Sequence, residues 1–598
     1  MFLTELARFY EHKVAEPDSG IPMPGFSEED IGYVIRISPD GEYIHHLSLM
    51  NGKNRPRRIR VPAAEKRSGK KVVPNFLWDN TGYVLGVDNK GNEKRSLKTF
   101  EAFRKKHADL AGKTDNASLK AVAAFLERWN PDRFSEWSDR ETVLGKNIVF
   151  EIEGENGFVH EQPDVRELWQ QLRKEEREEG NEEKGFCLVT GRQAPIARIH
   201  PAIRGLKGGE AKTALVSFNK DAFTSYGKEQ SYNAPVSVQA AQAYTTALNW
   251  LLRAENGHSA GIGDTSIVFW TDKPAPKEEK AVFDFFGTTD KTDAQSPQAE
   301  DEELVRDMRG VFKAMRDGQP PEKALRGFDP QVRFFILGIA PNSARIAVRF
   351  WQTATFGELA ERLGRYYAEL SLEPFPDRQP EFPAFWQILN DIFGRYRKNP
   401  EKKELKLAPP KQIPPKLGDT FLQSVLAKRY YPTSLYTAVL QGIRADQTVS
   451  YLRAAVIKAY LIRNQKQEFA MSLDTERKDV PYLLGRLFSL LEKNQRDALG
   501  KNINSTIRDR YIASASATPR RVFPLLLRLT QHHISKSEYE RSKQNDIAGV
   551  VNDIRDFPAT LTLEEQGVFF LGYYQQNTLP ITLKKIKEQN HDRYCKPL

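Results

Sequence analysis

Cysteine is almost absent from this chain, which has only Cys187 and Cys595 among its 598 residues. Two cysteines cannot build a disulfide framework or a cysteine-based zinc site, and so few are typical of a reducing cytosol. Long apolar runs are absent as well, and the mean hydropathy is −0.58, so we expect no membrane span. Residues 1–12 show no basic leader followed by an apolar stretch, so we expect no signal peptide and a cytoplasmic location.

Motifs of catalysis and metal binding are also scarce. The sequence has no Asp-x-Asp and no His-Glu-x-x-His. The segment His200–Thr213 is not a P-loop, because Ala211 stands where a glycine must precede Lys212. Cys187 lies in an apolar run, which favours a buried small side chain over a nucleophile. We therefore expect no catalytic residue, no metal and no cofactor; the alternative is a metal-dependent nuclease with a site of scattered carboxylates and lysines.

Positive charge is in moderate excess, with 89 Lys and Arg against 79 Asp and Glu, a net charge of +10. Such an excess indicates a polyanionic partner only where it is concentrated. The densest concentration is Lys53 to Lys71, with nine cations and one acid, Glu65. Phosphates lying between these cations would relieve their mutual repulsion, so the segment is predicted to contact nucleic acid. The alternative is a charged loop that is only solvated. The predicted phosphate contacts are Lys53, Arg55, Arg57, Arg58, Lys70 and Lys71, with Asn75 near enough to read a base edge.

Two further segments have the composition of loops that bind nucleic acid. Glycines in the first, His200 to Thr213, let backbone N–H groups approach phosphates, although an ordinary tight connection is the alternative. Its candidate residues are Lys207, Gly208, Gly209 and Lys212. The second, Ser225–Pro235, is rich in side chains that stack on bases or bond their edges, although a loop that caps the next helix is the alternative. Its candidate residues are Lys228, Gln230 and Asn233.

Periodicity predicts an α+β fold, with a mixed α/β N-terminal region that contains antiparallel hairpins and a C-terminal helical bundle. The predicted domains are 1–271 (α/β), 272–300 (linker), 301–394 (second α/β region), 395–416 (basic, proline-rich linker) and 417–598 (helical bundle). Predicted strands include 33–37 and 43–44 in a hairpin, 147–152, 187–189, 214–218, 265–270, 334–339 and 345–350. Predicted helices include 118–129, 165–172, 237–253, 479–491, and those opened by capping boxes at Thr355 and Thr562.

Eight segments, in order along the chain, resemble one family: the large subunit of the type I-C CRISPR interference complex (Cascade). They are Pro74–Asn80, Cys187–Gly191, Ile196–Pro201, Val216–Asn219, Ala222–Lys228, Tyr244–Asn249, Leu337–Arg345 and Phe569–Gln576. The resemblance implies a subunit that is not a nuclease and that reads the protospacer-adjacent motif (PAM) on duplex DNA. It also implies partners: a guide RNA with backbone and small subunits, the displaced DNA strand, and a helicase-nuclease recruited in trans. An RNA-binding scaffold outside CRISPR is the remaining alternative.

The resemblance also implies that the small subunit is translated from an internal start in the same gene. Met471 is one of only six methionines, and the residues after it, 471–598, are predicted as helices with apolar faces. A core or loop methionine is the alternative. We expect extra copies of this helical part to extend a basic surface for the displaced strand. The arginines placed along it are Arg508, Arg510, Arg520 and Arg521.

Overall fold

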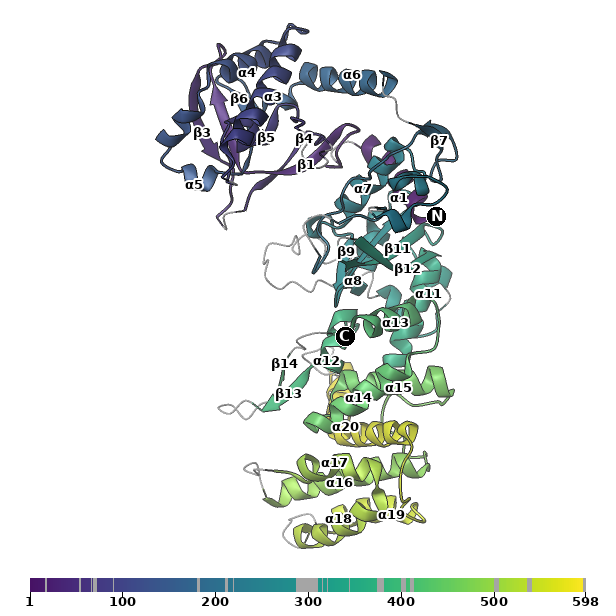
Figure 1. Cartoon of the computed structure of the whole chain (residues 1–598). Coiled ribbons are helices and arrows are strands. Elements are labelled where there is room, and N and C mark those ends of the chain that lie inside the picture. The colour runs from purple at the N-terminus through teal and green to yellow at the C-terminus, as the bar shows by residue number, and fades with distance from the viewer. Residues whose placement is uncertain are drawn as a thin grey trace. The chain divides into compact units, whose positions relative to one another are not determined.

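The computed structural model describes residues 1–16, 19–52, 55–65, 67, 72–89, 91–179, 183–209, 213–218, 220–286, 310–314, 316–319, 321–343, 345–373, 381–398, 405–408, 413–499, 505–534 and 540–594 (Figure 1). Unit one comprises residues 1, 3–201 and 216–247, and unit two comprises residues 2, 202–215 and 248–598. Within the described residues, no helix is long and apolar enough to cross a membrane.

Unit one is built on a four-stranded sheet with the order β3-β2-β6-β5. Its strands are β2 (Tyr33–Ile37), β3 (Tyr43–Ser48), β5 (Trp78–Asn80) and β6 (Asn147–Ile152). The antiparallel β2–β3 pair confirms the predicted hairpin, and β2 also pairs with β6 in parallel. Tyr33 and Ile35 pack into the main core of this unit, whereas Val34 packs on the opposite face. Both faces of the sheet are therefore covered.

Five helices contribute buried residues to the main core of unit one: α2 (Thr81–Val84), α3 (Glu93–Ala111), α4 (Ala117–Arg128), α5 (Arg140–Val143) and α6 (Pro163–Glu179). Helices α1 (Phe2–Ala15) and α7 (Val238–Leu251) contribute no residue to this core, and α7 continues into unit two. The helices predicted at 118–129, 165–172 and 237–253 are confirmed. Asn116 caps α4 by accepting a hydrogen bond from the Leu119 N–H at 2.7 Å.

A two-stranded ribbon, β1 (Phe26–Ile31) and β4 (Arg57–Pro62), lies on the other face of the sheet. Its strands are antiparallel. Ile59 and Val61 alternate with exposed residues and pack with Val34, Trp78 and Val149 of the sheet. This alternation points Arg58 and Arg60 outward.

The prediction of strands at 187–189 and 214–218 is wrong. The pair found here is β7 (Lys184–Phe186) with β8 (Gln193–Pro195), and the turn between them is closed by the Gly191 N–H, which donates to the Cys187 carbonyl. Cys187 is buried as expected, and its Sγ accepts N–H groups of Ser237 at 3.2 Å and Thr190 at 3.4 Å. Short apolar runs do not distinguish a strand from a buried turn, which explains the error.

Unit two begins with an antiparallel sheet of order β12-β11-β10-β9. Its strands are β9 (Ser259–Ile262), β10 (Thr265–Thr271), β11 (Arg333–Asn342) and β12 (Arg345–Thr355), which confirms the strands predicted at 265–270, 334–339 and 345–350. The linker predicted at 272–300 is wrong for residues 276–286, which form helix α8 (Pro276–Phe286). Phe285 and Phe286 of α8 are buried in the core of unit two. Residues 287–300 lie outside the described residues.

The second predicted linker, 395–416, also contains regular structure. Residues Arg395–Lys398 (β13) and Leu405–Ala408 (β14) form an antiparallel ribbon, and helix α13 begins at Pro415. The capping box at Thr355 is present, with Glu358 reaching back to the Thr355 N–H. The remaining helices of unit two are α10 (Pro321–Ala324), α11 (Phe356–Leu370), α12 (Phe385–Phe393), α13 (Pro415–Leu426), α14 (Thr433–Asp446), α15 (Tyr451–Gln465), α16 (Val480–Leu499), α17 (Ile507–Ala517), α18 (Pro519–Ile534), α19 (Glu540–Asn552) and α20 (Leu563–Tyr594).

The fold is therefore α+β, as predicted: small, mostly antiparallel sheets precede a helical C-terminal region. The helix predicted at 479–491 is confirmed by α16, and the Thr562 capping box opens α20.

Candidate nucleic-acid interface

Strand β4 carries three of the five described cations of the basic segment, Arg57, Arg58 and Arg60, and Arg55 and Arg67 lie on either side of it in the sequence. Arg55, Arg57 and Arg58 are exposed, as a phosphate-binding role requires. The ribbon also places acids opposite this strand, because β1 pairs Glu28 with Arg60 and Asp30 with Arg58. The Arg58 Nε lies 3.4 Å from an Asp30 carboxylate oxygen. The net positive charge around β4 is therefore lower than the cations of the segment alone would give. The sequence does not show this, because strand pairing brings the acids of β1 next to β4.

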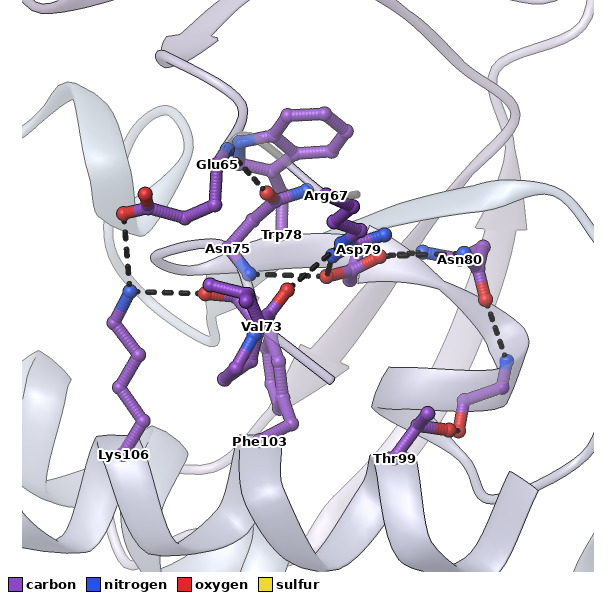
Figure 2. Close-up of polar contacts among 12 residues, drawn as sticks. Glu65, Arg67, Val73, Asn75, Trp78, Asp79, Asn80, Thr99, Phe103 and Lys106 are labelled. Atoms are coloured by element: carbon purple, nitrogen blue, oxygen red, sulfur yellow. Dashed lines mark hydrogen bonds and ion pairs between the residues drawn. The ribbon is translucent and has the colours of Figure 1, made fainter. Parts of the chain in front are cut away.

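The motif Pro74–Asn80 forms a buried polar network beneath this segment, which Figure 2 shows. Asn75 is only 3% exposed, and its Oδ1 accepts the Glu65 N–H at 2.9 Å. Its own backbone N–H donates to Asp79 at 3.0 Å. The prediction that Asn75 reads a base edge is therefore not supported by its placement, because its side chain is turned inward and holds the backbone.

The carboxylate of Asp79 is the centre of this network. It is 1% exposed and accepts hydrogen bonds from Arg67, from the Asn75 N–H and from the Asn80 N–H. Burial raises the pKa of Asp79, and the positive charge of Arg67 opposes that rise. The Arg67 guanidinium also donates to the Val73 carbonyl at 2.7 Å and lies 4.0 Å from the centre of the Tyr83 ring.

The network therefore holds residues on both sides of Lys70 and Lys71 in the sequence. Lys106 of α3 adds a hydrogen bond to the Pro74 carbonyl at 2.9 Å and an ion pair with Glu65 at 3.5 Å (Figure 2). Glu65 and Arg67 precede Lys70 and Lys71, and Val73 to Asn75 follow them. Lys53, Lys66, Lys70 and Lys71 themselves lie outside the described residues.

The glycine loop belongs to unit two, where it packs on the sheet. The Lys207 N–H donates to Ser266 Oγ of β10 at 3.3 Å, and Ile203 bridges Thr213. Lys207 and Gly208 are exposed, and Gly208 has φ +70°, a conformation that favours glycine. Gly209 is half-buried, and a Cβ there would lie 3.2 Å from that of Leu206. Lys212 lies outside the described residues.

The loop at 225–233 belongs to unit one and is shaped by a tight turn. Tyr226 (φ +52°) and Gly227 (φ +71°) are its central residues, and Ser225 bridges Lys228. Two positive φ values in succession define a type I′ turn. Asn233 ties this turn down: its Oδ1 accepts the Ser225 N–H at 3.0 Å, and its Nδ2 donates to the Lys228 carbonyl at 2.6 Å.

The side chains that this loop presents differ from the predicted set. Asn233 is engaged within the loop, and Gln230 is half-buried, so neither is freely presented to a ligand. Lys228 is exposed, as predicted, and Tyr226 is 98% exposed at the tip of the turn. Sequence reasoning noted the aromatic type of Tyr226 but did not select it, because exposure at a turn tip is not visible in the sequence.

The four arginines predicted for the displaced strand lie on two neighbouring helices, α17 and α18. Arg510, Arg520 and Arg521 are exposed, although Arg520 also pairs with Asp556 at 3.2 Å. Arg508 is different, because its side chain is only 19% exposed and lies 3.9 Å from a carboxylate oxygen of Glu492. Three of the four are therefore placed on the surface.

The sequence also contains a Gly-x-Ser-x-Gly motif, Gly257 to Gly261. In a hydrolase this motif forms a sharp turn between a strand and a helix that exposes the serine. Here Ser259 opens strand β9 of a hairpin, and its hydroxyl donates to the Leu252 carbonyl at 3.4 Å. The geometry is not that of a nucleophile elbow. Within the described ranges, no group of three or more His, Cys, Asp or Glu is placed to hold a metal ion.

A family model described as CRISPR-associated protein (Cas_Csd1) matches residues 6–579, nearly the whole chain. No curated protein matches the chain.

Proposed function

Because the chain belongs to the CRISPR-associated Csd1 family, the large subunits of type I-C interference complexes, we propose that it recognises the PAM on duplex target DNA. It then promotes R-loop formation with the guide RNA, stabilises the displaced strand and helps to recruit the helicase-nuclease. It performs these steps without catalytic residues of its own. In guide-dependent systems of this kind, protein reads the PAM and base pairing reads the remaining sequence.

The observation that supports this proposal most directly is the buried network of Asn75, Asp79 and Arg67 beneath the basic segment. Phosphate contacts fix the register of a protein on a duplex, and they do so best from a rigid base. The network fixes backbone on both sides of Lys70 and Lys71, and exposed arginines of β4 continue the positive charge. A cationic segment held in this way is suited to fixing the register on a duplex.

The test replaces Lys70 and Lys71 with Ala in the full chain and measures duplex binding by the assembled complex over a range of salt concentrations. We expect weaker binding to every sequence, and a salt slope reduced by about 2 for two lost phosphate contacts. The matched control is Lys94→Ala with Lys98→Ala, which removes two exposed lysines of α3. Equal effects in both pairs, or no effect in either, would show that Lys70 and Lys71 make no specific phosphate contact.

The absence of catalysis has its own test. Incubation of the purified chain with DNA and Mg²⁺ or Mn²⁺ should leave the DNA intact. Metal-dependent cleavage that follows the chain through purification would contradict the proposal and favour a nuclease.

A further inference from the structure

The β13–β14 ribbon of unit two is strongly basic. Its eight residues, Arg395–Lys398 and Leu405–Ala408, include four cations and no acid. Arg395 and Arg397 are exposed and stand two residues apart on one strand, so they share a face. The ribbon packs against α14 (Figure 1). A basic ribbon anchored on a helix differs from the extended linker that its composition predicts.

A cavity of about 590 Å³ opens where this ribbon meets the ends of α14 and α17. Three arginines line it, two from β13 and one from α17, together with the side chain of Tyr396. The lining residues that matter here are Arg395, Tyr396, Arg397, Thr448, Ser505 and Arg508. Its volume lies within the range of about 300–1,000 Å³ that small-molecule sites occupy, which is ample for a nucleotide.

Two carboxylates also line this cavity, and internal partners engage both. Asp446 receives the guanidinium of Arg453 through both oxygens, at 2.7 and 2.9 Å. Asp509 accepts the Thr506 N–H at 3.0 Å and so caps helix α17. Arg453 counters the charge of Asp446, and Asp509 lies 3.6 Å from Arg508, so Arg395 and Arg397 leave the cavity with an excess of positive charge for a ligand.

Arg508 is the deepest of the three arginines. Its Nε is buried and has no hydrogen-bond acceptor among the described residues. A Glu492 carboxylate oxygen lies 3.9 Å from this Nε, beyond hydrogen-bond distance, and an Asp509 oxygen lies 3.6 Å from the Arg508 Nη2. A buried guanidinium N–H without an acceptor is costly, and the oxygen of a ligand in the cavity would relieve that cost.

We propose that this cavity and the adjoining basic ribbon bind a single-stranded nucleic acid, with its phosphates on Arg395 and Arg397 and one nucleotide in the cavity. Guanidinium groups match phosphate geometry through paired N–H donors. A duplex does not fit this description, because a paired base enters a cavity only after unstacking at a cost of about a few kcal/mol. The assignment rests on the proposed function and deepens it, since an R-loop supplies a displaced DNA strand as one ligand. The guide RNA carries the same phosphates and is the other source of a single strand.

The experiment measures how tightly the purified full-length chain binds fluorescein-labelled single strands of about 12 nucleotides, a length typical of such sites. DNA and RNA of one sequence are compared by fluorescence anisotropy for wild type and for Arg395→Ala with Arg397→Ala. We expect the double variant to bind about 25-fold more weakly near 0.1 M salt, about fivefold for each lost contact. Loss on both strands supports phosphate recognition in general, whereas loss on RNA alone assigns the site to the guide.

The control removes two exposed cations elsewhere in unit two, Lys323 and Arg326. Only the three-dimensional position of the charges differs between the two pairs, and unchanged melting temperatures establish that both variants fold. Unaltered single-strand affinity in the ribbon variant, or an equal loss in the control, would overturn the proposed site. PAM-dependent duplex binding, measured in parallel on the assembled complex, should survive in the ribbon variant; its absence from wild type would contradict the proposed function instead.

Discussion

Arg453 is fully buried in unit two, and its guanidinium donates five hydrogen bonds. Two go to the carboxylate of Asp446, and the others go to the carbonyls of Asp391, Gly394 and Thr448. Asp391 lies in the last turn of α12, and Gly394 lies directly before β13. Asp446 ends α14, and Thr448 follows it. One side chain therefore joins three segments around the cavity at the base of the ribbon.

Replacing Arg453 with Met should destabilise the protein by about 3–5 kcal/mol, because it leaves Asp446 buried without a counter-charge. Denaturant unfolding monitored by circular dichroism measures the change. Arg520→Met is the control, since Arg520 and its partner Asp556 are exposed, and an exposed pair contributes less than about 1 kcal/mol. Similar losses in both variants would show that the Arg453 network contributes no more than a surface pair.

Asn75 gives a prediction that separates two roles. Asn75→Ala removes the acceptor of the Glu65 N–H, so stability should fall by about 1–3 kcal/mol. Thermal melting of the variant and of wild type tests this. An Asn75→Ala variant that melts like wild type and only changes PAM preference would restore the base-reading role predicted from the sequence.

The backbone of Tyr226 is strained, and the packing of its side chain does not explain the strain. A residue other than glycine, asparagine or aspartate at φ +52° costs about 1–2 kcal/mol, yet the ring is 98% exposed. Exposed aromatic rings stack on unpaired bases. Tyr226→Ala should therefore slow R-loop formation, followed with 2-aminopurine in the target, more than it weakens initial duplex binding, and Tyr226→Phe should not. Slowing by Gln230→Ala alone would assign the opening step to Gln230 instead.

At the scale of elements, the sequence predicted the helices and strands that are specified by residues close together in the chain. It did not predict elements whose burial depends on distant residues. The capping boxes at Thr355 and Thr562 and the β2–β3 hairpin are fixed by residues close together in sequence. Helix α8 was missed because its neighbours along the chain are polar and proline-rich, whereas its burial comes from strands and helices far along the sequence. The β13–β14 ribbon was missed because its charge resembles that of a linker.

The candidate site was predictable only in part, for the same physical reason. Runs of cations are visible in the sequence, and Arg57, Arg58, Arg510 and Arg521 are indeed exposed. The acids that β1 places opposite β4 are not visible, because strand pairing brings them there. The inward orientation of Asn75 is equally hidden, since an exposed and a buried asparagine look alike in sequence.

The segment around Met471 carries an element-scale prediction. Met471 is 41% exposed and lies in the non-helical stretch between α15 and α16. Helices α16 to α20 follow it, and α16 packs along α20. Expression of the native gene should yield a short second product that begins at Met471 and co-purifies with the complex, and Met471→Leu should remove it. A short product that survives this substitution would place the start elsewhere.

At the scale of the whole molecule, the net charge of +10 is spread over two units with different placements of cations. Unit one carries the exposed arginines of β4, and unit two carries the basic ribbon and the arginines of α17 and α18. We propose that the first set meets duplex DNA and the second meets single strands. The salt dependence of the two binding activities should therefore respond to different substitutions.

The most direct measurement uses the complex assembled with a guide RNA and a pool of duplexes that share the guide-matched target but differ in the flanking bases. Bound duplexes are recovered and sequenced. We expect one short flanking motif to be enriched, and the Lys70→Ala, Lys71→Ala variant to enrich the same motif with a lower yield, because phosphate contacts carry little sequence information. Recovery of target duplexes without any flanking preference would contradict the claim that this chain recognises a PAM.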